Sequence, residues 1–218
     1  MKQEIIECIK REKIIAIMRG VYGDDCIKLA KLLIENGIHI MEVPFDLSVE
    51  DNSNTINAIK RIKNEIPNVI IGAGTVVSVD LLNKAKEAGA QIIISPDSNE
   101  EVIKETIRSG MVSIPGAVTP TEVMFAKKCG ADFIKLFPAS NLGASYIKAV
   151  TSPINNIDLL AVGGINEKNA YEFIKAGAVG VGVGCVANRA LIKENNWGTI
   201  EKIIKELKVS IESKQISG

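Results

Sequence analysis

Aromatic residues are scarce in this sequence, at 4% of 218 residues, and histidine occurs once, as His39. The core must therefore consist mainly of isoleucine, valine, leucine and alanine, and the hydrophobic content of 46% is enough for an extensive one. Without a second histidine or a cluster of carboxylates, a catalytic metal is not expected. The four cysteines, Cys8, Cys26, Cys129 and Cys185, have no paired spacing, which argues against a zinc site and a disulfide framework.

The sequence also lacks an excess of either charge, because Lys+Arg and Asp+Glu both number 26. A neutral chain gives no indication of nucleic acid or an anionic membrane as a partner. No hydrophobic run approaches the length of a membrane span. The first seven residues alternate charged and aliphatic side chains and do not resemble the apolar region of a signal peptide, so we expect a cytoplasmic protein.

Short apolar runs bounded by glycine or proline recur along the chain and alternate with amphipathic segments. Such runs are typical of strands that are buried on both faces of a parallel sheet. The runs predict strands at 14–18, 38–43, 68–72, 91–95, 111–115, 133–138, 158–162 and 179–183. The amphipathic segments predict helices at 1–12, 24–37, 52–65, 79–88, 99–109, 120–129, 143–150, 167–176 and 197–213.

Eight strand–helix cycles in this length predict an α/β fold, a closed (β/α)8 TIM barrel with an extra N-terminal helix. An open doubly wound sheet is the alternative. No linker, low-complexity stretch or change of composition divides the chain, so residues 1–218 are expected to form a single domain.

One lysine, Lys135, interrupts an apolar run that begins at Phe133 and ends at Pro138. Burying an ammonium group without a partner costs several kcal/mol or forces the group to lose its proton. A neutral amine is a nucleophile towards ketones. The run alone favours the alternative, a lysine that ends an edge strand and extends to water, so evidence for a catalytic lysine must come from the rest of the chain.

Two further charged residues, Arg19 and Glu42, lie at the same ends of predicted strands as Lys135. In barrels of this kind the catalytic groups gather at the carboxyl ends of the strands. Each of the two lies two residues beyond an aliphatic residue, Ile17 or Ile40, and so shares a face with it. Arg19 is as compatible with a salt bridge to Glu42 as with binding of a substrate carboxylate, for which a guanidinium is well suited.

Glycines follow the last two predicted strands, as Gly163-Gly164 and as Gly182 and Gly184. Their backbone N–H groups, close to the start of a helix, could hold a phosphate, although glycine after a strand more often forms only a tight turn. A further turn ends at Thr75, whose hydroxyl is available to a substrate oxygen. His39 lies near the start of a strand, away from these groups, and is expected to be structural.

Together these motifs resemble the 2-keto-3-deoxy-6-phosphogluconate (KDPG) and 4-hydroxy-2-oxoglutarate (KHG) aldolases along nearly the whole chain. The resemblance is carried by Ile71-Gly-Ala-Gly-Thr-Val76, Ile94-Ser-Pro96, Ile114-Pro-Gly-Ala-Val-Thr-Pro-Thr-Glu122, Phe133-Ile-Lys-Leu-Phe-Pro138 and Val162-Gly-Gly-Ile165. It implies a (β/α)8 lyase of carbohydrate metabolism, of the Entner–Doudoroff type, that is typically a homotrimer and needs no metal or other cofactor.

The resemblance also implies roles for individual residues. Lys135 would form the Schiff base and Glu42 would be the general acid and base. The substrate would be a small 2-oxo acid, phosphorylated in the main branch, cleaved to pyruvate and glyceraldehyde 3-phosphate, or to pyruvate and glyoxylate from 4-hydroxy-2-oxoglutarate. The residues lining it would be Arg19, Thr75, Pro96, Gly163, Gly164, Gly184 and Cys185.

Two positions depart from the family pattern. Asp46 stands where many members have an arginine that holds the substrate carboxylate, and an anion cannot do this. The 2-keto-3-deoxy-6-phosphogalactonate (KDPGal) branch also lacks that arginine, and there an arginine at the place of Arg19 serves instead. Cys185 stands where relatives have a serine near the phosphate; packing is the simpler role for a cysteine at this position.

Two other functions remain compatible with the motifs. A phosphosugar isomerase or decarboxylase on the same barrel would use the glycine turns, with Lys135 only as an electrostatic partner. A barrel that binds a phospholigand without turnover is the second, because a fold alone does not establish activity.

Overall fold

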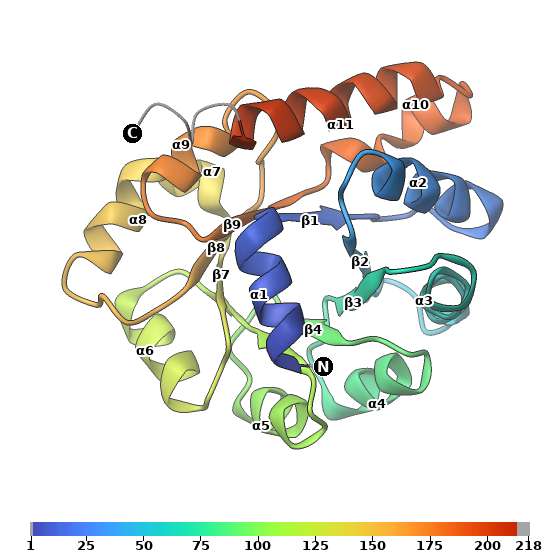
Figure 1. Cartoon of the computed structure of the whole chain (residues 1–218). Coiled ribbons are helices and arrows are strands. Elements are labelled where there is room, and N and C mark those ends of the chain that lie inside the picture. Colours follow the sequence, from blue (N-terminus) through green and yellow to red (C-terminus); the bar gives the residue numbers. More distant parts are fainter. Residues whose placement is uncertain (1, 213–218) are drawn as a thin grey trace.

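The computed structural model describes residues 2–212, and it has parallel strands surrounded by helices (Figure 1). The strands are β1 (Ile14–Ile17), β2 (Ile40–Pro44), β3 (Ile70–Gly74), β4 (Ile92–Ile94), β5 (Val112–Ile114), β6 (Gly116–Ala117), β7 (Ile134–Leu136), β8 (Leu159–Val162) and β9 (Gly180–Val183). The helices are α1 (Lys2–Glu12), α2 (Gly23–Glu35), α3 (Ser53–Glu65), α4 (Val79–Glu87), α5 (Glu100–Arg108), α6 (Pro120–Lys128), α7 (Ala139–Leu142), α8 (Ala144–Thr151), α9 (Ala170–Lys175), the 3-10 helix η1 (Cys185–Ala187), α10 (Arg189–Lys193) and α11 (Trp197–Glu212).

The sheet runs β5-β4-β3-β2-β1-β9-β8-β7-β6, and β5 and β6 at its two ends are consecutive in the chain. Pro115 separates them, because a proline has no N–H to give to a neighbouring strand. Its carbonyl still accepts the N–H of Lys135 at 2.8 Å, and the Ser113 carbonyl accepts that of Phe133 at 3.2 Å. β5 and β6 therefore act as one strand position that closes the ring, and the predicted (β/α)8 barrel is confirmed.

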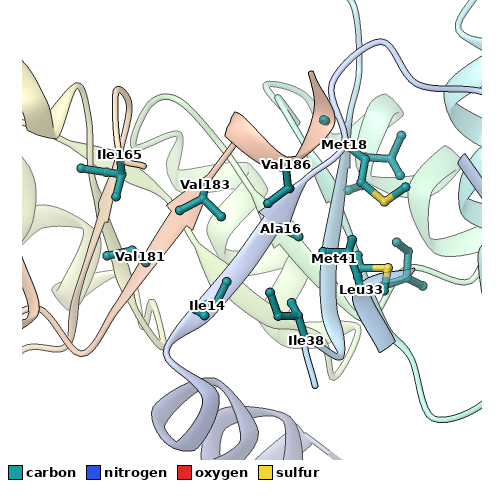
Figure 2. Packing of buried hydrophobic residues seen from close by; sticks show 14 of the residues in the cluster. Ile14, Ala16, Met18, Leu33, Ile38, Met41, Ile165, Val181, Val183 and Val186 are labelled. Atoms are coloured by element: carbon teal, nitrogen blue, oxygen red, sulfur yellow. The ribbon is translucent and has the colours of Figure 1, made fainter. Parts of the chain in front are cut away.

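Alternate residues of β1 belong to two separate apolar clusters. Ile15 and Ile17 of β1 pack in the barrel interior, and Ile14 and Ala16 pack outward against the helices. Figure 2 shows the outward set, in which β1 lies beside β9 with Ile14 in parallel register with Val181. This period of two fixes which side chains point into the barrel.

Helix α1 lies across one opening of the ring of strands (Figure 1). Its Ile9 is fully buried in the interior cluster. Lys10 forms an ion pair of 2.7 Å with Asp158, which directly precedes β8, so α1 covers the amino end of the strands. His39 lies at this end too, where Glu12 accepts its backbone N–H at 3.0 Å, in agreement with the structural role expected for it.

The helices differ from expectation mainly where they are short. α7, η1 and α10 have four, three and five residues and were not predicted. The helix expected from residue 167 begins at Ala170, because Asn169 accepts the N–H of Asn166 at 2.8 Å and donates to the Gly164 carbonyl at 2.9 Å, holding the segment in a turn. The last helix is described to Glu212, and residue 213 lies outside the described range. Between residues 2 and 212 no helix is both long and apolar enough to cross a membrane.

Candidate active site

A cavity of about 730 Å³ opens at the end of the barrel opposite α1. It is lined by residues within or just after β1, β2, β3, β4, β7, β8 and β9, which is where catalytic groups gather in this architecture. Of the residues predicted from the sequence, the lining contains Arg19, Glu42, Thr75, Pro96, Lys135, Gly163, Gly164 and Gly184. Residues more than a hundred positions apart in the chain thus meet in one cavity.

Lys135 lies in the middle of β7 and points into the barrel, with 6% of its surface exposed. Burial lowers the pKa of its amine; the Glu42 carboxylate opposes this shift, and the Arg19 guanidinium adds to it. Its Nζ lies 4.9 Å from the centre of the Phe137 ring, which also lines the cavity. An amine with a lowered pKa is neutral, and therefore nucleophilic, over a wider range of pH.

Glu42 lies on the interior face of β2 with 2% of its surface exposed. Burial raises the pKa of its carboxyl group against the opposing effects of Lys135 and Arg19. Gly74 on β3 makes room for it, since a Cβ at that position would come within 1.8 Å of the Glu42 Oε1. A carboxyl group with a raised pKa is suited to both releasing and accepting a proton near neutral pH.

Arg19 follows β1 and is exposed to the cavity. It makes no hydrogen bond or ion pair with any residue from 2 to 212, so the salt bridge to Glu42 that the sequence left open is not formed. Asp46 also lines the cavity, but its carboxylate accepts the N–H and hydroxyl of Ser48, at 2.9 and 2.6 Å, which lowers its pKa. Arg19 is therefore a cation that is free to bind an anionic group.

Thr75 and Pro96 also line the cavity, after β3 and β4. Thr75 has a φ of 58°, in the left-handed region that β-branched residues rarely adopt. Strained backbone of this kind concentrates at functional sites. The conformation is consistent with a hydroxyl that is held in place for a substrate.

The turns after β8 and β9 bring three glycines, Gly163, Gly164 and Gly184, to the cavity. None of them donates its backbone N–H to another residue in the described part of the chain. The carbonyls of Gly163 and Gly164 are engaged, by the Ser140 N–H at 3.0 Å and by the Asn169 amide at 2.9 Å. The N–H groups are thus available to an anionic oxygen, and binding of a phosphate at these turns stays a prediction.

Cys185 does not line the cavity within the described residues. It is half-buried against the outer apolar cluster, and burial raises the pKa of its thiol to about 11. The thiol is therefore neutral and unreactive at physiological pH. This placement agrees with a packing role, and a contact between Cys185 and the substrate stays a prediction.

The sequence analysis missed Arg189, Phe137 and Gly74. Arg189 is exposed at the start of α10 and lines the cavity. It lies five residues beyond the last glycine turn, inside a helix too short to show a periodic pattern. Gly74 lay within a turn that was noted, but its contact with Glu42 depends on the pairing of β2 with β3. No group of three or more His, Cys, Asp or Glu side chains within residues 2–212 is placed to hold a metal ion.

Comparison with known proteins supports the family resemblance found in the sequence motifs. The family model described as KDPG and KHG aldolase matches residues 5–203. The 2-dehydro-3-deoxy-6-phosphogalactonate aldolase of Escherichia coli (strain K12) is 34% identical over 81% of this chain and 85% of its own.

Two solved structures have the same fold over nearly the whole chain. The structure described as native KDPGal is 29% identical, with a TM-score of 0.81, over 92% of this chain and 94% of its own. The KDPG aldolase of Legionella pneumophila, captured with pyruvate as a covalent carbinolamine intermediate, is 27% identical, with a TM-score of 0.83, over 93% of this chain and 97% of its own. The resemblance predicted from the motifs is therefore confirmed: this chain belongs to the KDPG and KHG aldolase family, a family of carbon–carbon lyases.

Proposed function

We propose that this chain cleaves a 2-keto-3-deoxy-6-phospho sugar acid to pyruvate and glyceraldehyde 3-phosphate through a Schiff base at Lys135. One observation carries the proposal: Lys135 and Glu42 are both buried beside the same cavity. Burial lowers the pKa of the lysine and raises that of the glutamate, so it favours the neutral form of each. An uncharged amine and a carboxyl group able to exchange protons are the two groups that imine formation requires.

In the first half of the reaction the neutral Lys135 amine attacks the C2 ketone of the substrate. Glu42 donates a proton to the oxygen of the carbinolamine, which leaves as water and gives a protonated imine. Arg19 and the Thr75 hydroxyl bind the substrate carboxylate, because both reach the cavity and Arg19 pairs with no residue between 2 and 212. A guanidinium makes two parallel hydrogen bonds to a carboxylate and so orients the ketone.

In the second half the protonated imine accepts the electrons of the breaking bond. Glu42 takes the proton of the C4 hydroxyl, the C3–C4 bond breaks, and the aldehyde leaves. The enamine that remains on Lys135 is protonated at C3, and water then releases pyruvate and restores the amine. The N–H groups of Gly163, Gly164 and Gly184 hold the phosphate at the far end of the substrate.

Reduction with borohydride in the presence of pyruvate tests the proposal. We expect a stable pyruvate adduct on the peptide that contains Lys135, found by mass spectrometry. Lys135→Ala should give no adduct, and Lys128→Ala, an exposed lysine on α6, should give the same adduct as the unaltered protein. An isomerase or a non-catalytic binding protein would leave Lys135 unmodified, so absence of the adduct would refute the Schiff base.

A substrate panel tests the second part of the proposal. Pyruvate release is measured from 2-keto-3-deoxy acids of the gluconate and galactonate series, with and without the terminal phosphate, and from 4-hydroxy-2-oxoglutarate. We expect the highest kcat/KM for a phosphorylated acid. A higher value for 4-hydroxy-2-oxoglutarate would overturn this preference.

We further propose a cytoplasmic homotrimer, as is typical of the family. The exposed Met124 and Phe125 on α6 offer apolar surface for contacts between subunits, with 47% and 42% of their surface accessible in the isolated chain. Light scattering with size-exclusion chromatography measures the mass directly, and a monomer or dimer would contradict the trimer. Cell fractionation tests the location.

A further inference from the structure

Only two of the five arginines of this chain lack a partner among the residues described. Arg11 pairs with Glu12, Arg61 pairs with Asp24 and Glu65, and Arg108 pairs with Glu105. Arg19 and Arg189 make no hydrogen bond or ion pair within residues 2–212. Both line the cavity that contains Lys135. A substrate with two anionic ends would supply one partner to each guanidinium.

The position of Arg189 is fixed by the chain around it. Asn188 caps α10, and its side-chain oxygen accepts the N–H groups of Ala190 and Leu191 at 3.1 and 3.2 Å. The Arg189 side chain lies over Gly20 in the turn after β1, where a Cβ on Gly20 would stand 3.2 Å from the Arg189 Cδ and 3.3 Å from its Nη1. The guanidinium therefore extends from the segment after β9 toward the turn after β1, and both Arg189 and Gly184 line the cavity.

The other groups assigned above to the phosphate are the backbone N–H groups of Gly163, Gly164 and Gly184. Cys185 does not line the cavity in the part of the chain described, and its thiol lies against the backbone N–H groups of Val186 and Glu167. A terminal phosphate carries a charge between −1.5 and −2 at neutral pH, so dipoles alone leave it without a full counter-charge. A guanidinium supplies that charge and a planar pair of donors that matches two phosphate oxygens.

We propose that Arg189 binds the terminal phosphate of the substrate and sets the preference of this enzyme for phosphorylated over unphosphorylated sugar acids. Arg19 then serves the carboxylate end, and the two unpaired arginines divide the two anionic groups of the substrate between them. The inference rests on the aldolase function proposed above, and it adds a specificity residue to that reaction.

The test compares kcat/KM for 2-keto-3-deoxy-6-phosphogluconate or 2-keto-3-deoxy-6-phosphogalactonate, whichever the enzyme cleaves faster, with that for the same acid without phosphate. A hydrogen-bonded charge pair of this kind is worth about 1.5–3 kcal/mol, which is a factor of roughly 10–150. We expect Arg189→Ala to lower the preference for the phosphorylated acid by about this factor, and Arg189→Lys to recover part of it. Lys193→Ala, which removes a positive charge from the same helix, is the matched control and should keep the preference.

Three outcomes would overturn the inference: no change in kcat/KM for either acid, an equal loss for both, or an equal loss of preference in Lys193→Ala. Binding of sn-glycerol 3-phosphate, followed by calorimetry, tests the same site without any cleavage. Its affinity should fall in Arg189→Ala and hold in Lys193→Ala. Failure of pyruvate trapping on Lys135 refutes the Schiff base, whereas unchanged glycerol phosphate binding in Arg189→Ala refutes the role of Arg189.

Discussion

At the scale of single residues, the site depends on a balance between burial and charge attraction. Lys135 and Glu42 attract each other, which alone would keep the amine protonated and the carboxyl group ionised. Burial acts in the opposite direction on both and is the larger cause of each shift. The interior of the barrel, filled with aliphatic side chains, thus contributes to the proposed chemistry, because it shifts both groups toward their uncharged forms.

The opposing effects of burial and of neighbouring charges predict the pKa of Lys135. Its pKa should lie below 10.5, the value for an unperturbed lysine, because burial disfavours the charged form. Arg19→Gln removes a nearby cation that lowers this pKa, so the pKa should rise in that variant. A titration followed by the 13C NMR signal of the Lys135 Cε measures both values. A pKa at or above 10.5 in the unaltered protein, or a fall in Arg19→Gln, would contradict the account.

A second prediction concerns the glycine beside Glu42. In Gly74→Ala the new Cβ would overlap the Glu42 carboxyl group, which must then leave its position. We expect kcat to fall by about 10²–10⁴, the range for loss of a positioned acid–base group, and Glu42→Gln to show a similar loss. Gly198→Ala, in α11 with no atom within 4 Å of the new Cβ, is the control and should retain full activity. Full activity in a folded Gly74→Ala protein would show that Glu42 has no such constraint.

At the scale of helices and strands, the long elements followed from the sequence and the short ones did not. The apolar runs identified all eight strand positions, because strands buried on both faces have few polar residues to interrupt the pattern. α7, η1 and α10 are too short for a helical period to be visible. Arg189 was missed for this reason, although it belongs to the cavity.

Helix α1 is the element that closes the amino end of the barrel, and its contribution is to stability. Ile9 is fully buried in the interior cluster. Ile9→Ala should therefore leave a cavity among aliphatic side chains. We expect the free energy of unfolding to fall by about 2–5 kcal/mol, measured by denaturant titration. The exposed Glu7→Ala on the same helix is the control and should change it little. In Ile9→Ala, kcat should be retained under conditions where the protein is folded, because the reacting groups lie at the other end.

At the scale of the whole molecule, the barrel places stabilising contacts at the amino end of the strands and the cavity at their carboxyl end. It also brings residues together that are distant in the chain. α1 and its ion pairs stabilise the amino end of the strands, whereas the residues of the cavity come from seven different strands or the turns after them. Motif spacing could predict which residues lie at the carboxyl ends, since all strands are parallel. It could not predict that Arg189 crosses to the turn after β1, or that Gly74 accommodates Glu42, because both contacts require the closed ring.

The chain has no net charge, yet two exposed arginines, Arg19 and Arg189, lie at one mouth of the barrel with no ion-pair partner among residues 2–212. An anionic substrate is attracted to this mouth by charges that salt screens, since the Debye length falls from about 30 Å at 0.01 M to about 10 Å at 0.1 M salt. We therefore expect KM for the phosphorylated acid to rise several-fold over this range of KCl while kcat changes little, because Lys135 and Glu42 are buried and poorly screened. The rise should be smaller for the unphosphorylated acid and in Arg189→Ala. A salt effect that falls on kcat instead would mean that screening acts on the reacting pair and not on the entry of the substrate.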